Sequence, residues 1–408
     1  MSVRVAFPRP SIATMSANRV TYAPPRGDTR TGRWAALDVA RGVAVAGMLL
    51  VEQLPAGPGE YPWLRHASWN GWTGADLVFP AFLFLVGISV DQLIGRRGAA
   101  AIGRLAKRAL ALVVVGVLFN AWAADGGDFA QARWPGVLQR IGIVSFACGL
   151  IVVLLRRKAW PVLAIAAGLL VCYAQLLTRV PLACGTGVIT QACNLPGRVD
   201  VAVFGSAHIY HQGAFGHDPE GLLSTLGALA TALLGVCAGR FMRARPGWRT
   251  FAALGGLALL GWLSTRVGFA GPTVNKRLWT PAFVLLTGTT SVALLLVCHL
   301  VADTAGEAAA ASRRVVRGVA RAIAWPWAAL GRNALIVYVG QHVLGAILQK
   351  TPAHNGSQPT SLAGYLQGRT FAGGWFGLDA QWTYVVAMLA LWSAVAAAMH
   401  SARWYVTL

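Results

Sequence analysis

The chain has few charged residues, and few of these are acidic. Asp, Glu, Lys and Arg make up only 12% of its 408 residues, and Asp and Glu together number 14. A typical soluble domain has about 25% charged residues, so a soluble globular protein is excluded. Apolar residues make up 56% of the chain, and the mean hydropathy is +0.56. This composition is typical of a multi-pass membrane protein.

Long apolar segments recur along the chain. Each approaches or exceeds the length of about 18 residues that crosses the hydrocarbon of a bilayer. They predict an all-α polytopic membrane protein with about ten transmembrane helices. The segments are 34–53, 74–94, 105–124, 138–155, 160–177, 222–239, 251–267, 280–302, 328–348 and 383–401. No periodic internal repeat is evident, in contrast to many secondary transporters.

The net charge of +21 is concentrated in alternate connections between these segments. By the positive-inside rule the basic connections lie in the cytoplasm, so we expect both termini to be cytoplasmic. Short basic clusters next to a bilayer contact anionic headgroups, and no nucleic-acid partner is expected. The clusters lie at 4–33, 96–108, 156–158, 240–249 and 313–321.

Outside the apolar segments the chain has no room for a second domain. Residues 1–33 hold prolines among Ser, Thr and Arg without the apolar core of a signal peptide, so we expect a disordered cytoplasmic tail. Residues 34–408 are expected to form one transmembrane domain. Within it, 178–221 is predicted to be a long external loop and the Ala- and Arg-rich stretch 303–324 a cytoplasmic linker helix.

Cysteine is also scarce. The chain has six, four of them inside predicted helices, where a free thiol is usually a small apolar side chain. Cys184 and Cys193 lie in the long external loop, where an oxidising compartment permits a disulfide, and we predict that they pair. His208, His211 and His217 of the same loop have no acidic or Cys partner at firm spacing, so no metal site is expected.

The most informative stretch is 64–89, which reads LRHASWNGWTGADLVFPAFLFLVGIS. It places His66 in a polar loop directly before a long apolar helix. An imidazole titrates near neutrality, so it can take a proton, give one or accept an acyl group. Because Trp69 and Trp72 follow it, His66 also fits an anchor at the membrane surface. Asp76 either caps the start of the helix or orients the ring of His66.

Other ionisable residues lie in or beside predicted spans, where charge is costly and often marks function. Asp38 and Arg41 are three residues apart, so they can neutralise each other on one helical face. His342 lies in the outer half of a span and is expected to line an external cavity. Asn275 and Lys276 lie in an external connection, where the lysine departs from the positive-inside pattern.

Six blocks of the sequence resemble, in order, blocks of the heparan-alpha-glucosaminide N-acetyltransferase family and its bacterial relatives. They read RWAALDVARGVAVAGMLLVE, LRHASWNGWTGADLVFPAFLFLVGIS, WPGVLQRIG, HIYHQGAFGHDPEGLLSTLGALATALLGVCAG, NKRLWTPAFVLLTG and LGRNALIVYVGQHV. The blocks extend from residue 33 to about residue 345, so the resemblance is far more specific than any single motif.

The resemblance implies a transmembrane acetyltransferase, which takes acetyl-CoA from the cytosolic side and acetylates an amino sugar or related glycan on the external side. By its place in the motif, His66 is then the catalytic base or, in a double displacement, the acetyl carrier. The family commonly has Asn after the first span, whereas this chain has Glu52 and Gln53. An ionised carboxylate cannot donate to an oxyanion. Either Gln53 has this role, or Glu52 acts on the acceptor or on His66.

These arguments predict a site with three groups of residues. The catalytic group is His66, Glu52, Gln53 and Asp76. The residues expected to bind the acceptor are Asn70, Trp69, Arg140, Asn275, Lys276 and His342. On the cytoplasmic side, CoA phosphates are expected to meet Arg41, Arg332 and Asn333, because Arg forks suit phosphate oxygens.

The resemblance also suggests a homodimer, and the richness in Ala, Gly and Arg suggests the inner (plasma) membrane of a bacterium. Two other functions stay open. One is a transporter of a polar solute, whose intramembrane charges would line a pathway, although the missing repeats argue against it. The other is an inactive membrane scaffold, although His66, Asp76 and the full external motif argue against that.

Overall fold

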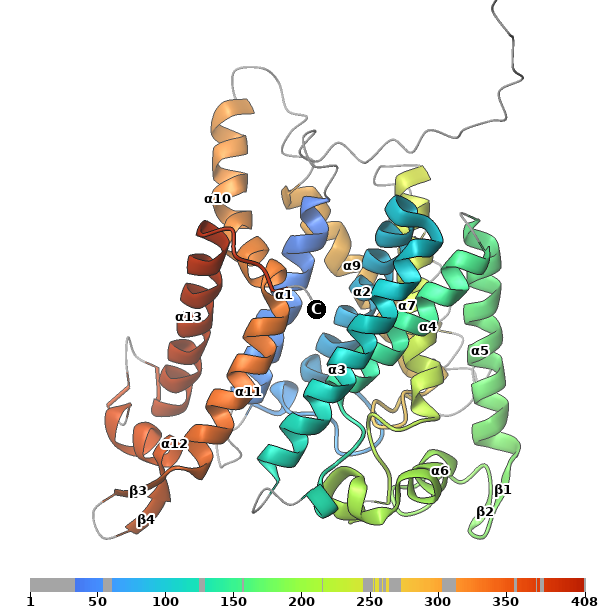
Figure 1. Ribbon diagram of the computed structural model, residues 1–408, viewed down its shortest axis with the longest axis horizontal. Coiled ribbons are helices and arrows are strands. Elements are labelled where there is room, and N and C mark those ends of the chain that lie inside the picture. Colours follow the sequence, from blue (N-terminus) through green and yellow to red (C-terminus); the bar gives the residue numbers. More distant parts are fainter. Residues whose placement is uncertain are drawn as a thin grey trace, which may run out of the picture.

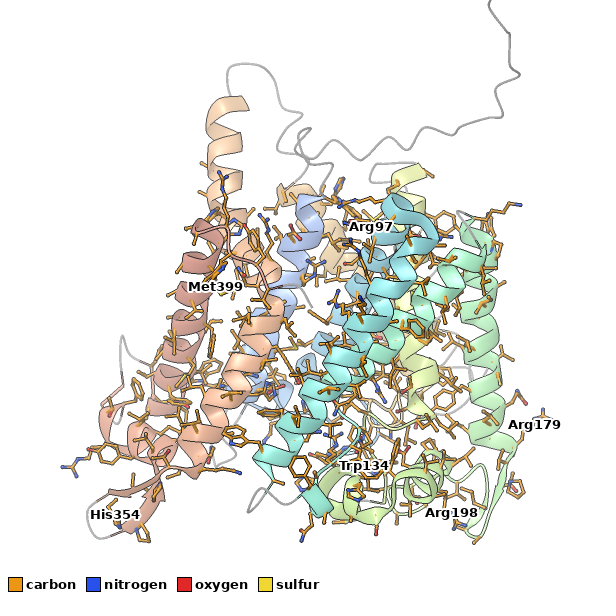
Figure 2. All side chains as sticks on the ribbon, viewed as in Figure 1. Arg97, Trp134, Arg179, Arg198, His354 and Met399 are labelled. Carbon is orange, nitrogen blue, oxygen red and sulfur yellow. A yellow bond between two sulfur atoms is a disulfide. The ribbon has the colours of Figure 1, made fainter. Side chains whose placement is uncertain are left out.

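A computed structural model gives the architecture of the protein. It describes residues 34–53, 61–124, 129–155, 158–214, 216–244, 273–302, 313–355, 358–371, 373–374 and 378–406, with short helical pieces between 252 and 263. Its long helices run roughly side by side in one bundle (Figure 1). The two ends of this bundle are called here the His66 end, at the bottom of Figure 1, and the Arg97 end, at the top, where Figure 2 labels Arg97.

Helices form almost all of the regular secondary structure among the described residues. The long ones are α1 (Ala35–Gln53), α2 (Val78–Arg97), α3 (Ala101–Ala123), α4 (Val137–Leu155), α5 (Ala159–Arg179), α7 (Ser224–Ala244), α9 (Pro281–Ala302), α10 (Arg313–Arg332), α11 (Ala334–Lys350) and α13 (Ala380–Ser401). The short elements are α6 (Leu195–Phe204), α12 (Leu362–Tyr365), the hairpin β1 (Pro181–Leu182) with β2 (Gly185–Thr186), and the hairpin β3 (Pro352–Asn355) with β4 (Gln358–Ser361).

The structure confirms an all-α fold with several helices that can span a membrane. Six stretches of the described residues are long and apolar enough to cross a membrane. The first of them, Gly74–Ala123, contains both α2 and α3. The expected count of about ten spans and the side of the termini stay predictions, and the expected span 251–267 lies largely outside the described residues.

The expected ninth span, 328–348, consists of parts of two helices. Helix α10 ends at Arg332 and α11 begins at Ala334. Between them the amide of Asn333 donates to the carbonyls of Ala329 and Ala396, at 3.0 and 3.3 Å. Side-chain bonds of this kind compete with the helical ladder. The helix expected in the linker 303–324 is likewise the first part of α10.

The start and the end of α2 follow from its sequence. Asp76 lies in a 3-10 turn, η2 (Gly74–Leu77), and forms a reciprocal capping box with Thr73 that satisfies backbone N–H groups before the apolar run begins. The helix ends at Gly98, whose φ of 59° favours glycine. The chain then reverses into α3 (Figure 1).

Glycines allow two helix pairs to approach at backbone contact. Between α2 and α7, a Cβ on Gly87 would lie 1.9 Å from the carbonyl oxygen of Ala232, and one on Gly235 would lie 2.0 Å from that of Phe84. Helix α1 meets α10 in the same way through Gly42. In a bilayer, where apolar burial gives little drive to association, small residues that permit close packing hold helices together.

The largest apolar core lies among α2, α4, α7 and α9. Leu83 of α2, Val144 of α4, Leu233 of α7 and Phe283 of α9 are completely buried in it. A second core joins α1 to α2, α7 and α9 around Leu37. Together with the glycine contacts, these cores fix α1 and α2 beside each other, and both helices carry residues of the candidate site.

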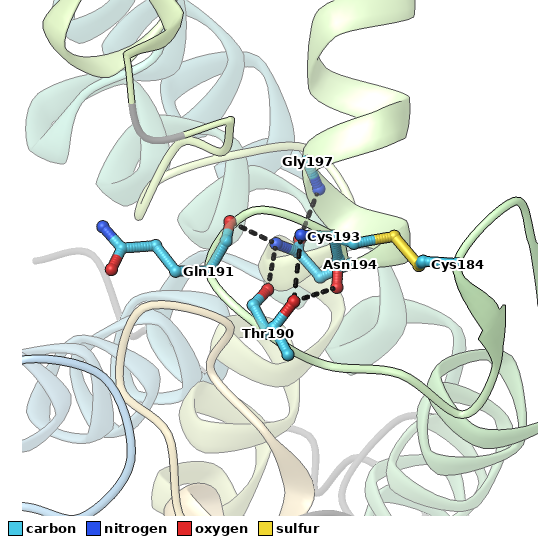
Figure 3. Close-up of a disulfide and its surroundings, with 6 residues drawn as sticks. All are labelled: Cys184, Thr190, Gln191, Cys193, Asn194 and Gly197. Atoms are coloured by element: carbon cyan, nitrogen blue, oxygen red, sulfur yellow. Dashed lines mark hydrogen bonds between the residues drawn. A yellow bond between two sulfur atoms is a disulfide. The ribbon is translucent and has the colours of Figure 1, made fainter.

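The long loop between α5 and α7 is folded at the His66 end. It contains the β1–β2 hairpin and α6, whose first turn is capped by Asn194 Oδ1, which accepts from the N–H of Gly197 at 2.8 Å. Cys184 and Cys193 form a disulfide in this loop, with a Cα–Cα distance of 6.6 Å (Figure 3). The bridge ties the hairpin to the segment that begins α6.

The close contact between α2 and α7 predicts that adding one methyl group at Gly87 lowers the stability of the protein. Replacing Gly87 by Ala would place Cβ inside a backbone carbonyl, so we expect a loss of stability of about 1–3 kcal/mol, as for overpacking in other cores. Gly95→Ala is the matched control, because no atom lies within 4 Å of a Cβ at that position of the same helix. Thermal unfolding of the two purified variants measures the difference. Equal melting temperatures would show that the helices do not pack this closely.

Candidate active site

Two loops that are distant in sequence lie side by side at the His66 end. The N–H of Gly71 donates to the carbonyl of Val274 at 2.8 Å. The side-chain oxygen of Asn70 accepts from Thr273 Oγ1 at 2.9 Å and from Asn275 Nδ2 at 3.3 Å. These bonds dock the segment that precedes α9 onto the loop that precedes α2, and they bring Lys276 to His66.

His66, Asp76 and Lys276 form a compact polar cluster. His66 Nδ1 lies 2.9 Å from Asp76 Oδ1. Lys276 Nζ lies 2.8 Å from Nδ1 and 3.1 Å from Nε2 of His66, and 3.3 Å from Asp76 Oδ1. The side chain of His66 is 45% exposed, whereas that of Asp76 is completely buried. The imidazole ring of His66 is therefore accessible to solvent while it contacts a buried carboxylate.

The carboxylate of Asp76 is held by both of its oxygens. While Oδ1 meets His66 and Lys276, Oδ2 accepts from the backbone N–H groups of Ala67, at 3.1 Å, and Thr73, at 3.0 Å. A buried carboxylate with this many donors stays in one position. It accepts Nδ1–H of His66 in the tautomer that leaves Nε2 as the basic nitrogen.

Lys276 is a partly buried cation in this loop. Burial lowers its pKa below the ordinary value, although the carboxylates of Asp76 and Glu220 oppose the shift. An ammonium group that is partly withdrawn from water is a strong hydrogen-bond donor to any negative charge that develops nearby.

Glu52 and His342 form a second acid–base pair, between the end of α1 and the middle of α11. His342 Nε2 lies 2.6 Å from Glu52 Oε2, and Gln341 Nε2 donates to the same oxygen at 3.0 Å. Gln53 donates to Gln341 Oε1 at 2.8 Å. The structure thus brings together Glu52, Gln53 and His342 from two helices that are far apart in the sequence.

A small cavity lies between the two pairs. Its volume is about 110 Å³. Both Glu52 and His66 line it, together with Lys276, Glu220 and Tyr338. The cavity is large enough for a small polar group and is lined by donors and acceptors of protons.

Glu220 enters this cavity from the segment that precedes α7. It is held there by Arg133, which contacts both Glu220 and Asp218, with Arg133 Nε donating to Asp218 Oδ2 at 2.8 Å. Burial by itself would lower the pKa of Arg133, but Glu220 and Asp218 raise it. The guanidinium group therefore stays charged and fixes the position of Glu220.

A larger cavity of about 300 Å³ lies deeper in the bundle, towards the Arg97 end. Arg41, Arg108 and Arg332 line it. The Nε atoms of Arg108 and Arg332 are buried and have no hydrogen-bond partner among the described residues. Their N–H groups suit the oxygens of a phosphate. Met48 and Tyr338 line both cavities, so the two adjoin there.

Several residues expected in the site are buried parts of its framework. Arg140 is 1% exposed, donates to the carbonyl of Gly221 at 3.1 Å and lies over the ring of Trp279. Trp69 Nε1 donates to the carbonyl of Ile189 at 2.8 Å. Asn275 and Asn333 are 0% and 2% exposed, and neither lines the two cavities.

Sequence reasoning missed three residues that line the cavities: Arg108, Glu220 and Tyr338. Arg108 belongs to a basic cluster of the kind that any cytoplasmic connection carries, so nothing singled it out. Glu220 is an acid in a long loop, and no spacing rule connects it to His66. An excess of charged residues within α3 and of acids next to α7 is the signal that would have pointed to them.

The structure therefore defines a multi-pass membrane protein with a His–Asp pair at one end of adjoining cavities and arginines at the other. Residues 33–204 match the family model of the catalytic part of heparan-alpha-glucosaminide N-acetyltransferase. The resemblance of the chain to this family is thus confirmed as a distant similarity.

Two similar proteins have the name heparan-alpha-glucosaminide N-acetyltransferase. The one from Homo sapiens is 28% identical over 372 residues, which cover 76% of this chain and 53% of that protein. The one from Mus musculus is 26% identical over 381 residues, which cover 79% of this chain and 55% of that protein. The chain spans about half the length of these curated relatives.

Asp200 of α6 contacts the segment that holds Glu220. Its burial predicts that the stability of the protein depends on pH. Asp200 is completely buried and accepts from the N–H of Asp218 at 3.2 Å and of Leu222 at 2.8 Å. Burial raises its pKa from 3.8 to about 6. Because the folded state binds this proton more tightly, Asp200 contributes stability that is full below pH 3.8 and is lost as the pH rises through about 6.

Asp200→Asn removes this titration. We expect the wild type to lose on the order of 3 kcal/mol relative to the variant between about pH 4 and pH 7. Melting temperatures of both proteins across this range measure the effect. Parallel curves would show that Asp200 has the same proton affinity in the folded and the unfolded chain.

Proposed function

We propose that this protein is a transmembrane acetyltransferase that moves an acetyl group from acetyl-CoA to an amino sugar or related glycan. The observation that carries the proposal is the His66–Asp76 pair at one end of two adjoining cavities whose other end is lined by three arginines. The match of residues 33–204 to the N-acetyltransferase family model supports the same reaction. The acetyl donor is a cosubstrate, and no metal is required.

The arginine-lined cavity is the proposed site of the donor. Its orphaned Arg108 and Arg332 N–H groups, with Arg41, suit phosphate oxygens, and its remaining walls are mostly apolar, including Met48, Phe82 and Val86. The apolar walls suit an extended thioester arm, which places its acetyl group near Met48 and Tyr338, where the cavities meet. Asn333 helps indirectly, because it holds the turn that follows Arg332.

The His66 cavity is the proposed site of acyl transfer. Asp76 holds Nδ1–H of His66, and Nε2 removes the proton of the acceptor as it attacks the thioester carbonyl. Lys276 Nζ lies on the same edge of the ring, where it can donate to the carbonyl oxygen as negative charge develops. The same geometry serves a double displacement, in which Nε2 is acetylated first. Gln53 orients Gln341, which contacts Glu52.

The remaining framework residues act on the acceptor site through the loops. Asn70 and Asn275 dock the two loops, Trp69 joins them to the segment 178–221, and Arg140 holds the segment before α7. We propose that this end faces the outside of a bacterial inner membrane and that the protein is a homodimer, as the charge distribution and the family suggest.

The first experiment tests the reaction itself. Purified protein in detergent is mixed with acetyl-CoA and glucosamine, and the released thiol is measured. We expect release that requires the amine, and a loss of about 100-fold or more in His66→Ala, as for removal of a general base. His354→Ala is the control, because His354 is exposed on the β3–β4 hairpin (Figure 2). Release that is independent of the amine or of His66 would contradict the proposal.

A second experiment tests the donor site. Arg108→Ala removes charge-assisted hydrogen bonds worth about 1.5–3 kcal/mol each, so we expect the KM for acetyl-CoA to rise about tenfold or more. The KM for the amine should stay the same. Arg104→Ala is the matched control, because Arg104 is an exposed arginine one turn earlier on α3. An effect of Arg108→Ala on the amine alone would place the donor elsewhere.

A further inference from the structure

Two separate histidine–carboxylate pairs each contribute one residue to the small cavity, and the reaction as proposed uses only one of these pairs. His66 with Asp76 lies on the loop before α2, and His342 with Glu52 lies between α11 and α1. Both pairs reach the cavity through His66 and Glu52. Two bases on one small cavity are more than the attack of a neutral nucleophile requires.

An amine acceptor, in contrast, does require two bases. An ordinary amino group has a pKa of about 8, so it arrives at neutral pH as an ammonium ion without a free lone pair. One proton must leave before attack, and a second leaves the nitrogen as the amide forms. The second passes through His66 to the sulfur of the departing thiol. The first has no destination in that cycle and must leave to water.

We propose that Glu52 takes the first proton from the acceptor ammonium group and that His342 is the residue that positions it. This inference rests on the proposed acetyltransferase function. An N–H bond of the ammonium breaks as an O–H bond to Glu52 forms, which leaves a neutral amine and a protonated carboxyl group. Glu52 then releases the proton to water in the cavity before the next turnover.

The contacts of Glu52 fit this role. His342 Nε2 and Gln341 Nε2 both bind its Oε2, and no described residue donates to its Oε1. One oxygen is thus held while the other remains for the acceptor. Glu52 is exposed, and both Glu52 and His66 line the small cavity. An amine bound to Oε1 would therefore share this cavity with His66.

His342 is suited to hold Glu52 through changes of protonation. Its Nδ1 lies 2.8 Å from the carbonyl oxygen of Tyr338 and 2.7 Å from Nε2 of Gln341. A protonated Nδ1 donates to the carbonyl, and an unprotonated Nδ1 accepts from the amide. The ring therefore has a hydrogen-bond partner for Nδ1 in either state, and Nε2–H stays on Glu52.

The other charged side chains that line the cavity are bound to partners of their own. Lys276 contacts the His66–Asp76 pair, and Glu220 is bound by Arg133. On α11, the side facing Glu52 presents Tyr338, Gln341 and His342. Glu52 is therefore the carboxylate of this cavity that is not paired with a permanent cation among the described residues.

The test compares acceptors and pH values in one variant. Glu52→Gln keeps the size and the hydrogen bonds of the side chain but cannot take a proton. With glucosamine at about pH 6.5, where the amine is charged, we expect thiol release to fall about 100-fold relative to the wild type. At about pH 9, where the amine is neutral, the ratio should shrink to within about threefold. With hydroxylamine, which is neutral at pH 7, the ratio of wild-type to variant activity should be small at both pH values.

Two variants test the role of His342. His342→Phe should show a loss of the same kind with glucosamine, again confined to low pH, because Glu52 loses the closer of the two donors to its Oε2. His342→Gln restores an N–H donor and should recover most of the activity. His354→Gln is the control for the substitution itself, since His354 lies on the exposed hairpin.

The outcomes separate this inference from the proposed function. Equal losses at every pH and with both acceptors would give Glu52 a merely structural role and overturn the inference. Wild-type activity in Glu52→Gln would overturn it as well. Both results leave the acetyltransferase function intact. A wild type without amine-dependent thiol release would instead overturn that function and this inference with it.

Discussion

The rest of the site depends on one buried carboxylate. A carboxylate without exposure to water is costly unless donors surround it, and Asp76 finds them in two backbone N–H groups, His66 and Lys276. Its need for donors closes the turn before α2, orients the imidazole and draws in a lysine from a loop that lies 210 residues away in the sequence. The capping of a membrane helix and the orientation of the His66 ring are therefore one arrangement.

The local part of this arrangement was predictable from sequence. Capping of α2 by Asp76 and orientation of His66 by Asp76 stood as alternatives, and the structure contains both, since the two oxygens of one carboxylate serve different partners. The non-local part was not predictable. Whether Lys276 meets His66, or Glu52 meets His342, depends on which helices pack together. The cost of burying charge likewise marks Arg140, yet the contacts of Arg140 with Gly221 and Trp279 lie in the framework.

Helical spacing explains how one end of the bundle is connected to the other. Arg41, Met48 and Glu52 are separated by seven and four residues, so they lie on one face of α1. Leu335, Tyr338 and His342 follow the same rule on α11, at spacings of three and four. Each face contributes first to the arginine-lined cavity, then to the junction, then to the His66 end. The close contact of Gly42 with α10, which α11 directly follows, helps to fix the face of α1 relative to that of α11.

The same spacing determines what has to cross the membrane. Eleven residues of helix rise by about 16 Å, so the phosphates of a donor at Arg41 stay roughly this far from Glu52 while its uncharged arm fills the apolar walls between them. Only an acetyl group, which carries no charge, then needs to reach His66. In the proposed reaction the charged phosphates stay with the arginines, and the protons of the acceptor leave through the two histidine–carboxylate pairs. The separation avoids the cost of moving any ion through the apolar interior of the bundle.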